Sequence, residues 1–101
     1  MSAPFLSVVI PVFNEQSRIV ETLDQVLGYL GSQQYSWEVV VADDGSTDCT
    51  SSLVQHLIES RPNGNLRHIR LYHRGKGWAI KQGMLHASGE YRFMCDADLS
   101  M

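Results

Sequence analysis

The sequence has little cysteine, no long hydrophobic run and no excess of positive charge, and each absence excludes a class of protein. Only Cys49 and Cys95 are present, without C-x-x-C spacing, so we expect reduced thiols in a cytosolic protein and no disulfide scaffold. No apolar run reaches the length of about 18 residues expected of a membrane-spanning helix. The start of the chain also lacks the basic residues of a secretory signal. The net charge of −3 and the pI near 5.7 give no general attraction to nucleic acid or to an anionic membrane.

The 101 residues suffice for one small domain, and a content of 44% apolar and 19% charged residues is typical of soluble globular proteins. Four apolar runs have the length and the β-branched or aromatic composition of strands: LSVVIPV from Leu6, WEVVVA from Trp37, LRHIRLY from Leu66 and YRFMCD from Tyr91.

Apolar residues at helical spacing predict three helices between these strands. The first covers 19–30 and ends at Gly31. The second is marked by Leu53, Val54, Leu57 and Ile58; it begins behind an N-cap at one of Ser46, Thr47 or Asp48 and stops before RPNGN. The third, with a weaker pattern, carries Ile80, Met84 and Ala87 and ends at Gly89.

The resulting order, βαβαβαβ, predicts an α/β protein with a Rossmann-like, doubly wound parallel sheet and helices on both faces. In the common strand order 3-2-1-4, ligands bind outside the carboxyl ends of the strands where the winding reverses. Glu15 follows the first strand, Asp43 and Asp44 follow the second, and Asp96 and Asp98 follow the fourth. All five carboxylates are therefore expected at one edge of the sheet, around a single ligand site.

Asp96 and Asp98 are two residues apart in a segment expected to be extended, so their side chains should point the same way. At about 6 Å and an effective dielectric constant of about 20, two carboxylates repel by roughly 3 kcal/mol, which a bound cation would offset. Oxygen ligands favour Mg²⁺ or Mn²⁺, and Mg²⁺ completes its shell with water and substrate phosphates. A metal-held phosphorylated ligand is therefore predicted. Taken alone, the stretch DDGSTD is equally well explained as a strand-to-helix turn.

Other nucleotide-site patterns are absent. The first strand ends in PVFNE with no G-x-G-x-x-G turn, and HRGKGWA does not fit a Walker A loop. Arg74 and Lys76 stand where a helix should begin, which favours either an anion site or a solvated basic turn. The four histidines lack metal-ligand spacing and are interpreted as surface or packing residues.

Three motifs in order resemble the inverting, family 2 glycosyltransferases of the GT-A fold, over nearly the whole chain. SVVIPVFNE resembles their first strand and its loop, VVVADDGSTD their second strand and acidic turn, and FMCDADLS their D-x-D strand. Within the family, GKGWAIKQGML is most similar to the polyprenyl-phosphate glycosyltransferases. Trp78 departs from the small residue that usually follows G-K-G.

The resemblance implies a role for each matching residue. Nucleotide-sugar-binding residues would be Pro11, Phe13 and Glu15 around the nucleoside, Asp44 with Asp43 at the base, Lys76 near the nucleotide, and Asp96 with Ala97 at the ribose or sugar. Asp98, with Asp96, would bind the Mg²⁺ or Mn²⁺ on the diphosphate. Ser100 stands where mannosyl relatives often have a further ligand.

The implied activity is transfer of a sugar, glucose from UDP-glucose, to a polyprenyl or dolichyl phosphate at the cytoplasmic face of a membrane. Because family members continue far beyond the D-x-D strand, residues 1–101 are expected to be the N-terminal donor-binding domain, inactive alone, with the catalytic base beyond Met101. Self-association through the exposed fourth strand is also expected. The alternatives are a non-catalytic nucleotide-binding fragment and a GDP-mannose-dependent mannosyltransferase. A receiver domain is disfavoured because LYHRGKG carries no Asp after the third strand.

Overall fold

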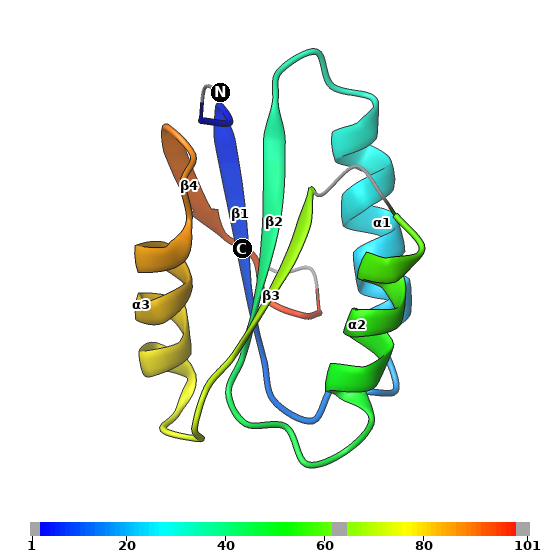
Figure 1. The fold of residues 1–101 in the computed structure, drawn as a ribbon, viewed down its shortest axis with the longest axis vertical. Coiled ribbons are helices and arrows are strands. Elements are labelled where there is room, and N and C mark those ends of the chain that lie inside the picture. Colours follow the sequence, from blue (N-terminus) through cyan, green and yellow to red (C-terminus); the bar gives the residue numbers. More distant parts are fainter. Residues whose placement is uncertain (1–2, 62–64, 99–101) are drawn as a thin grey trace.

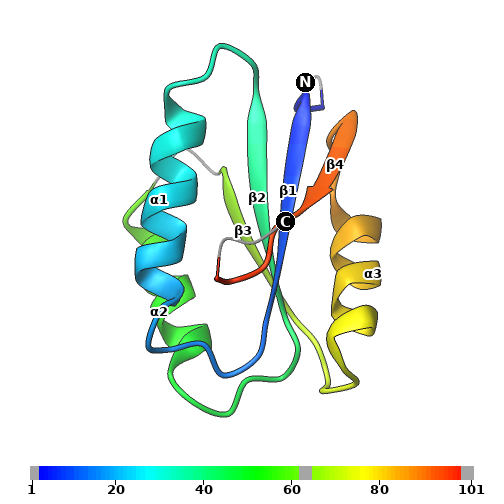
Figure 2. The ribbon, with the colours of Figure 1, turned by 180° about the vertical axis from the view of Figure 1, so that it is seen from behind.

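The computed structural model describes residues 3–61 and 65–98, which form one four-stranded parallel sheet between helices (Figures 1 and 2). The sheet has the order β3-β2-β1-β4, so both the predicted βαβαβαβ sequence of elements and the predicted strand order are confirmed. The elements are β1 (Leu6–Val12), α1 (Ile19–Gly31), β2 (Trp37–Asp43), α2 (Thr50–Glu59), β3 (Leu66–Arg70), α3 (Lys76–His86) and β4 (Tyr91–Met94).

Alternate residues of the two central strands face opposite layers. Ile10, Val39 and Val41 belong to the core beneath α1 and α2, whereas Val9 and Val40 belong to the smaller core beneath α3. Both faces are covered, which explains why β1 and β2 read as continuous apolar runs rather than as alternating ones. Figure 1 shows α3 on one side of the sheet and the pair α1 and α2 on the other.

Close packing of α3 on the sheet depends on Gly83. A Cβ at this position would collide with the side chain of Val9 on β1 and crowd Ala42 on β2. The helix therefore lies close to β1 and β2, and its first turn reaches the carboxyl edge of the sheet.

Among the described residues, no helix combines the length and the apolar character needed to cross a bilayer.

Several element ends differ from the sequence predictions, and β2 extends one residue further than expected, to Asp43. β3 stops at Arg70 and β4 at Met94, both earlier than the apolar runs suggested. The third helix starts at Lys76 and ends at His86, so Ala87 lies just outside it with an extended backbone. The strand ends are set by backbone pairing with the neighbouring strand, which composition alone does not encode.

The predicted N-cap of α2 is also displaced. Cys49 occupies the cap position and its side chain makes no capping bond. Asp48, one residue earlier, instead accepts a hydrogen bond from the Thr50 backbone N–H at 2.9 Å. One of the three candidate residues therefore does serve the helix start, but from outside the cap position.

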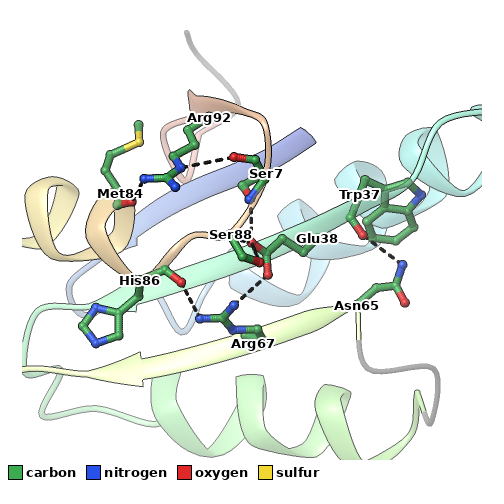
Figure 3. Close-up of polar contacts among 10 residues, drawn as sticks. Ser7, Trp37, Glu38, Asn65, Arg67, Met84, His86, Ser88 and Arg92 are labelled. Atoms are coloured by element: carbon green, nitrogen blue, oxygen red, sulfur yellow. Dashed lines mark hydrogen bonds and ion pairs between the residues drawn. The ribbon is translucent and has the colours of Figure 1, made fainter. Parts of the chain in front are cut away.

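A buried carboxylate fixes the connection between α3 and β4 to the opposite, amino edge of the sheet (Figure 3). Glu38 is only 5% exposed and accepts hydrogen bonds from Ser7 Oγ at 2.6 Å and from the Ser88 N–H at 2.7 Å. Arg67 forms an ion pair with it at 2.8 Å. Burial alone would raise the pKa of Glu38, but these partners outweigh burial and hold its pKa below the ordinary value.

Two arginines close the C-terminal end of α3 (Figure 3). Arg67 donates to the His86 carbonyl at 2.7 Å and Arg92 donates to the Met84 carbonyl at 2.9 Å. Cations at this end satisfy unpaired helix carbonyls and oppose the negative end of the helix dipole. The helix is thereby anchored at one end, while its other end stands at the carboxyl edge.

Candidate functional site

A cavity of about 320 Å³ opens at the carboxyl edge of the sheet, beyond the ends of β1 and β4 and beside the start of α3. Eight of the nine residues predicted for the site line it: Pro11, Phe13, Glu15, Asp44, Lys76, Asp96, Ala97 and Asp98. The structure adds five that the prediction omitted: Val12, Arg18, His73, Gly75 and Ala79. The parallel sheet brings them together because every connection after a strand emerges at the same edge.

Asp43 is the predicted residue that does not reach the cavity. It is the last residue of β2 and lies on the same face as Val41, so its carboxylate points toward α2. There it accepts a hydrogen bond from the Ser46 N–H at 2.9 Å and from the Ser51 hydroxyl, and it lies 3.3 Å from His68 Nε2. The two adjacent carboxylates thus have different roles: Asp43 joins β2 to β3 and α2, and Asp44 faces the cavity.

Burial and hydrogen bonds act in opposite directions on the pKa of Asp43, and the hydrogen bonds together outweigh burial. Complete burial of its side chain would raise the pKa, but donation from His68, Ser51 and Ser46 holds the pKa far below its ordinary range. The carboxylate is therefore charged at neutral pH although it is buried. His68 is a packing residue, in agreement with its interpretation from the sequence, and Asp43 is its specific partner.

Asp44 organises the loop between β3 and α3. Its two carboxylate oxygens accept hydrogen bonds from the Arg74 N–H at 2.8 Å and the Gly75 N–H at 2.9 Å. The loop can approach because Gly45 has a φ of +76° and no Cβ, which would otherwise lie 2.8 Å from the His73 nitrogen. The side chain of Asp44 is 3% exposed, so it borders the cavity from a buried position.

The loops after β1 and β2 are locked together by residues of the two sequence motifs. Asn14, with a φ of 53°, receives a hydrogen bond at its side-chain oxygen from the Thr47 N–H at 2.8 Å and donates its own N–H to Ser46 Oγ at 2.9 Å. The Glu15 N–H donates to Thr50 Oγ1 at 2.8 Å. The polar residues of PVFNE and DDGSTD that do not line the cavity therefore hold its walls in place.

Asp96 lies in an irregular segment after β4 and Asp98 in the turn that follows it, so the two do not share the extended segment that was predicted, yet both border the cavity. Lys76 Nζ is 2.5 Å from Asp96 Oδ1 and partly balances this charge. Asp98 is exposed at the mouth. Ser100 lies outside the described residues.

The oxygen donors near this turn fit part of the metal site that the sequence predicts. Within residues 3–61 and 65–98, no three His, Cys, Asp or Glu side chains converge as a complete metal cage. Mg²⁺ commonly takes one or two protein carboxylates and completes its shell with phosphate and water oxygens. Asp98, with Asp96 beside it, fits such a partial site.

His73 is the main site residue that the sequence analysis missed. Its ring stacks on Phe13, with centroids 4.2 Å apart and planes inclined by 24°. Its Nδ1 lies 2.9 Å from Asp44 Oδ2. Arg18, also missed, pairs with Glu15; its spacing of three residues on the chain was the available signal. Trp78 lies outside the cavity, with the Arg74 guanidinium 5.0 Å from its ring centroid.

Fold and cavity together define a doubly wound α/β domain with an acidic ligand site at its topological switch point. The sequence pattern of glycosyl transferase family 2 matches residues 7–101, and the chain belongs to that family.

Named relatives agree with this assignment. The chain is 41% identical to a dolichyl-phosphate β-glucosyltransferase of Dictyostelium discoideum and 40% identical to one of Saccharomyces cerevisiae, each over 93% of the chain. It spans only 31% and 30% of those two proteins.

Solved structures show the same fold. A mannosyltransferase from Pyrobaculum calidifontis, in complex with GDP-Man and Mn²⁺, superposes with a TM-score of 0.81 at 35% identity, over 97% of this chain and 28% of that one. TarS of S. aureus in complex with UDP superposes with a TM-score of 0.73 at 31% identity, over 93% of this chain and 27% of that one. The expected GT-A type of fold is thereby confirmed.

Proposed function

We propose that residues 1–101 form the donor-binding domain of a glycosyltransferase that moves glucose from UDP-glucose to a polyprenyl or dolichyl phosphate. One observation carries the proposal: the same cavity is lined by Phe13, Asp44, Lys76, Asp96 and Asp98. Similarity to named dolichyl-phosphate β-glucosyltransferases supports both the sugar and the lipid acceptor.

The cavity offers a chemically matching side chain for each part of a sugar nucleotide. Phe13 offers an apolar ring and Asp44 a carboxylate acceptor, which suit the face and the N–H edge of a nucleobase. Lys76 supplies positive charge beside the diphosphate, and Asp96 borders the ribose or sugar. A divalent ion bound at Asp98 would act as a Lewis acid that stabilises charge on the departing nucleoside diphosphate.

The proposed acceptor indicates where in the cell the enzyme acts. A dolichyl or polyprenyl phosphate resides in a membrane, so we place the enzyme at the cytoplasmic membrane face, as a peripheral protein that takes its donor from the cytosol. The competing proposal is a GDP-mannose donor, which similarity to the GDP-Man-bound mannosyltransferase favours. Comparing UDP with GDP decides between them.

Calorimetric titration of the chain with UDP is the direct test, in Mn²⁺ and again with chelator. We expect binding in both conditions and tighter binding with metal. Asp44→Asn should weaken UDP about tenfold in both conditions, because a charge-assisted hydrogen bond to the base contributes about 1.5–3 kcal/mol. Stronger binding of GDP than of UDP would favour the mannosyl alternative, and no binding of either nucleotide would reject the proposed function.

We also propose that β4 is a site of self-association. Within the part of the chain that the structure describes, it pairs with β1 alone, and Tyr91 and Phe93 on it are 59% and 42% exposed. An apolar groove that includes Phe93, Val26 and Tyr29 lies beside it. An unpaired strand edge next to apolar side chains is a template for pairing with another chain.

Sedimentation over a concentration series should therefore detect a dimer that Phe93→Lys shifts toward monomer by about tenfold or more. Leu85→Lys, at an apolar residue that is 65% exposed on α3, is the matched control. A monomer at every concentration, with rapid amide exchange over 91–94, would contradict the proposal.

A further inference from the structure

The side chain of His73 already makes the two contacts that the proposed function assigns to a nucleobase. Its ring stacks on Phe13 at a centroid distance of 4.2 Å, as a base would. Its Nδ1 lies 2.9 Å from Asp44 Oδ2 and 3.1 Å from the Asp44 carbonyl oxygen. Both neighbours are acceptors, so Nδ1 carries a hydrogen and donates it, as a base N–H would.

The hydrogen-bonding capacity of Asp44 Oδ2 is thereby used up. It accepts the Gly75 N–H at 2.9 Å as well as His73 Nδ1, while Oδ1 accepts the Arg74 N–H at 2.8 Å. A carboxylate oxygen offers about two lone-pair directions, so a base cannot add a good hydrogen bond at Oδ2 while His73 remains there. The stacked face of Phe13 is covered in the same way.

Only the side chain of His73 has to move to release both positions. Its backbone is flanked by fixed points, because the Leu71 N–H donates to the Asp43 carbonyl at 2.9 Å and Arg74 and Gly75 donate to Asp44. The His73 side chain is 58% exposed, and Phe13 is 40% exposed, so the imidazole can swing into solvent by rotamer change. The loop itself keeps its place.

We infer that His73 is a placeholder for the nucleobase, a residue that occupies the base position in the free protein and that a nucleotide must displace. The inference rests on the proposed function, since it takes the base position from it. Because ligand affinity is reduced by the fraction of protein in a non-competent state, His73 sets a threshold for binding. Ligands without a base, such as pyrophosphate, do not compete with it.

The test compares His73→Ala with the wild-type chain by calorimetry, using UDP with Mg²⁺ and pyrophosphate with Mg²⁺. We expect His73→Ala to bind UDP about fivefold more tightly, with the affinity for pyrophosphate unchanged. His73→Phe, which can stack but cannot donate to Asp44, should fall between the two. Tyr72→Ala is the matched control, because Tyr72 is adjacent in the loop and 88% exposed.

A second readout follows the imidazole itself. In the free wild-type chain, stacking on Phe13 should shift the His73 ring protons in the NMR spectrum, and UDP should return them to ordinary values while pyrophosphate does not. Weaker or equal UDP binding by His73→Ala would overturn the inference, since His73 would then be a stacking platform or a bystander. Failure of the wild-type chain to bind UDP would instead reject the proposed function.

Discussion

Replacing Asp98 by Asn is expected to remove the metal-dependent part of UDP binding. Asp98 lies at the mouth of the cavity, and an Asn side chain of the same shape lacks the charge that a divalent ion requires. Loss of even outer partners of a metal site costs about 10–100-fold in affinity, so loss of a carboxylate ligand should cost at least about 100-fold for the metal. In calorimetry with Mn²⁺, Asp98→Asn should therefore bind UDP as weakly as the wild-type chain does in chelator.

The change in UDP affinity without metal distinguishes loss of the metal site from a general loss of folding. In chelator, the Asp98 carboxylate repels the diphosphate, so Asp98→Asn should bind UDP as well as the wild-type chain or slightly better. A general loss of folding would weaken binding in both conditions. Asp24→Asn, at an exposed carboxylate on α1 outside the cavity, is the control and should change neither titration. An undiminished response to Mn²⁺ in Asp98→Asn would assign the metal to other residues.

The sheet and the edge that holds the site were predictable because they depend on patterns that the chain repeats. Buried parallel strands read as continuous apolar runs, and alternation with amphipathic helices fixes the topology through handed crossovers. Glu15, Asp44, Asp96 and Asp98 follow three different strands, and the sequence alone predicts that they lie together, since strand ends in such a sheet share one edge.

The direction in which each side chain points was harder to predict from the sequence. Asp43 and Asp44 are adjacent, and only the exact residue at which β2 ends decides which of them faces α2 and which faces the cavity. His73 carries no spacing signal, and it reaches the site only because Gly45 admits its loop and Asp44 holds it. Tertiary contacts between loops decide such details, and single-chain periodicity does not record them.

The second large effect concerns stability and separates the roles of the two adjacent carboxylates. Asp43→Asn is expected to lower the free energy of unfolding at pH 7 by about 3 kcal/mol, because it leaves the partly buried Ser51 hydroxyl and the buried His68 ring without their charged acceptor. Since the Asp43 carboxylate points toward α2, UDP binding at low temperature should stay close to that of the wild-type chain. Urea denaturation with calorimetry measures both quantities.

The pH dependence follows from the depressed pKa of Asp43 in the folded chain. Such a group stabilises the fold fully above its unfolded pKa of about 3.9, and this contribution is lost as the pH falls toward the folded pKa. Wild-type stability should therefore decline below about pH 4, with Glu38 contributing in the same direction. Asp43→Asn should decline less, so the two stability curves should converge in acid. A variant as stable as the wild-type chain that no longer binds UDP would return Asp43 to the ligand site and would contradict its assignment as a structural carboxylate.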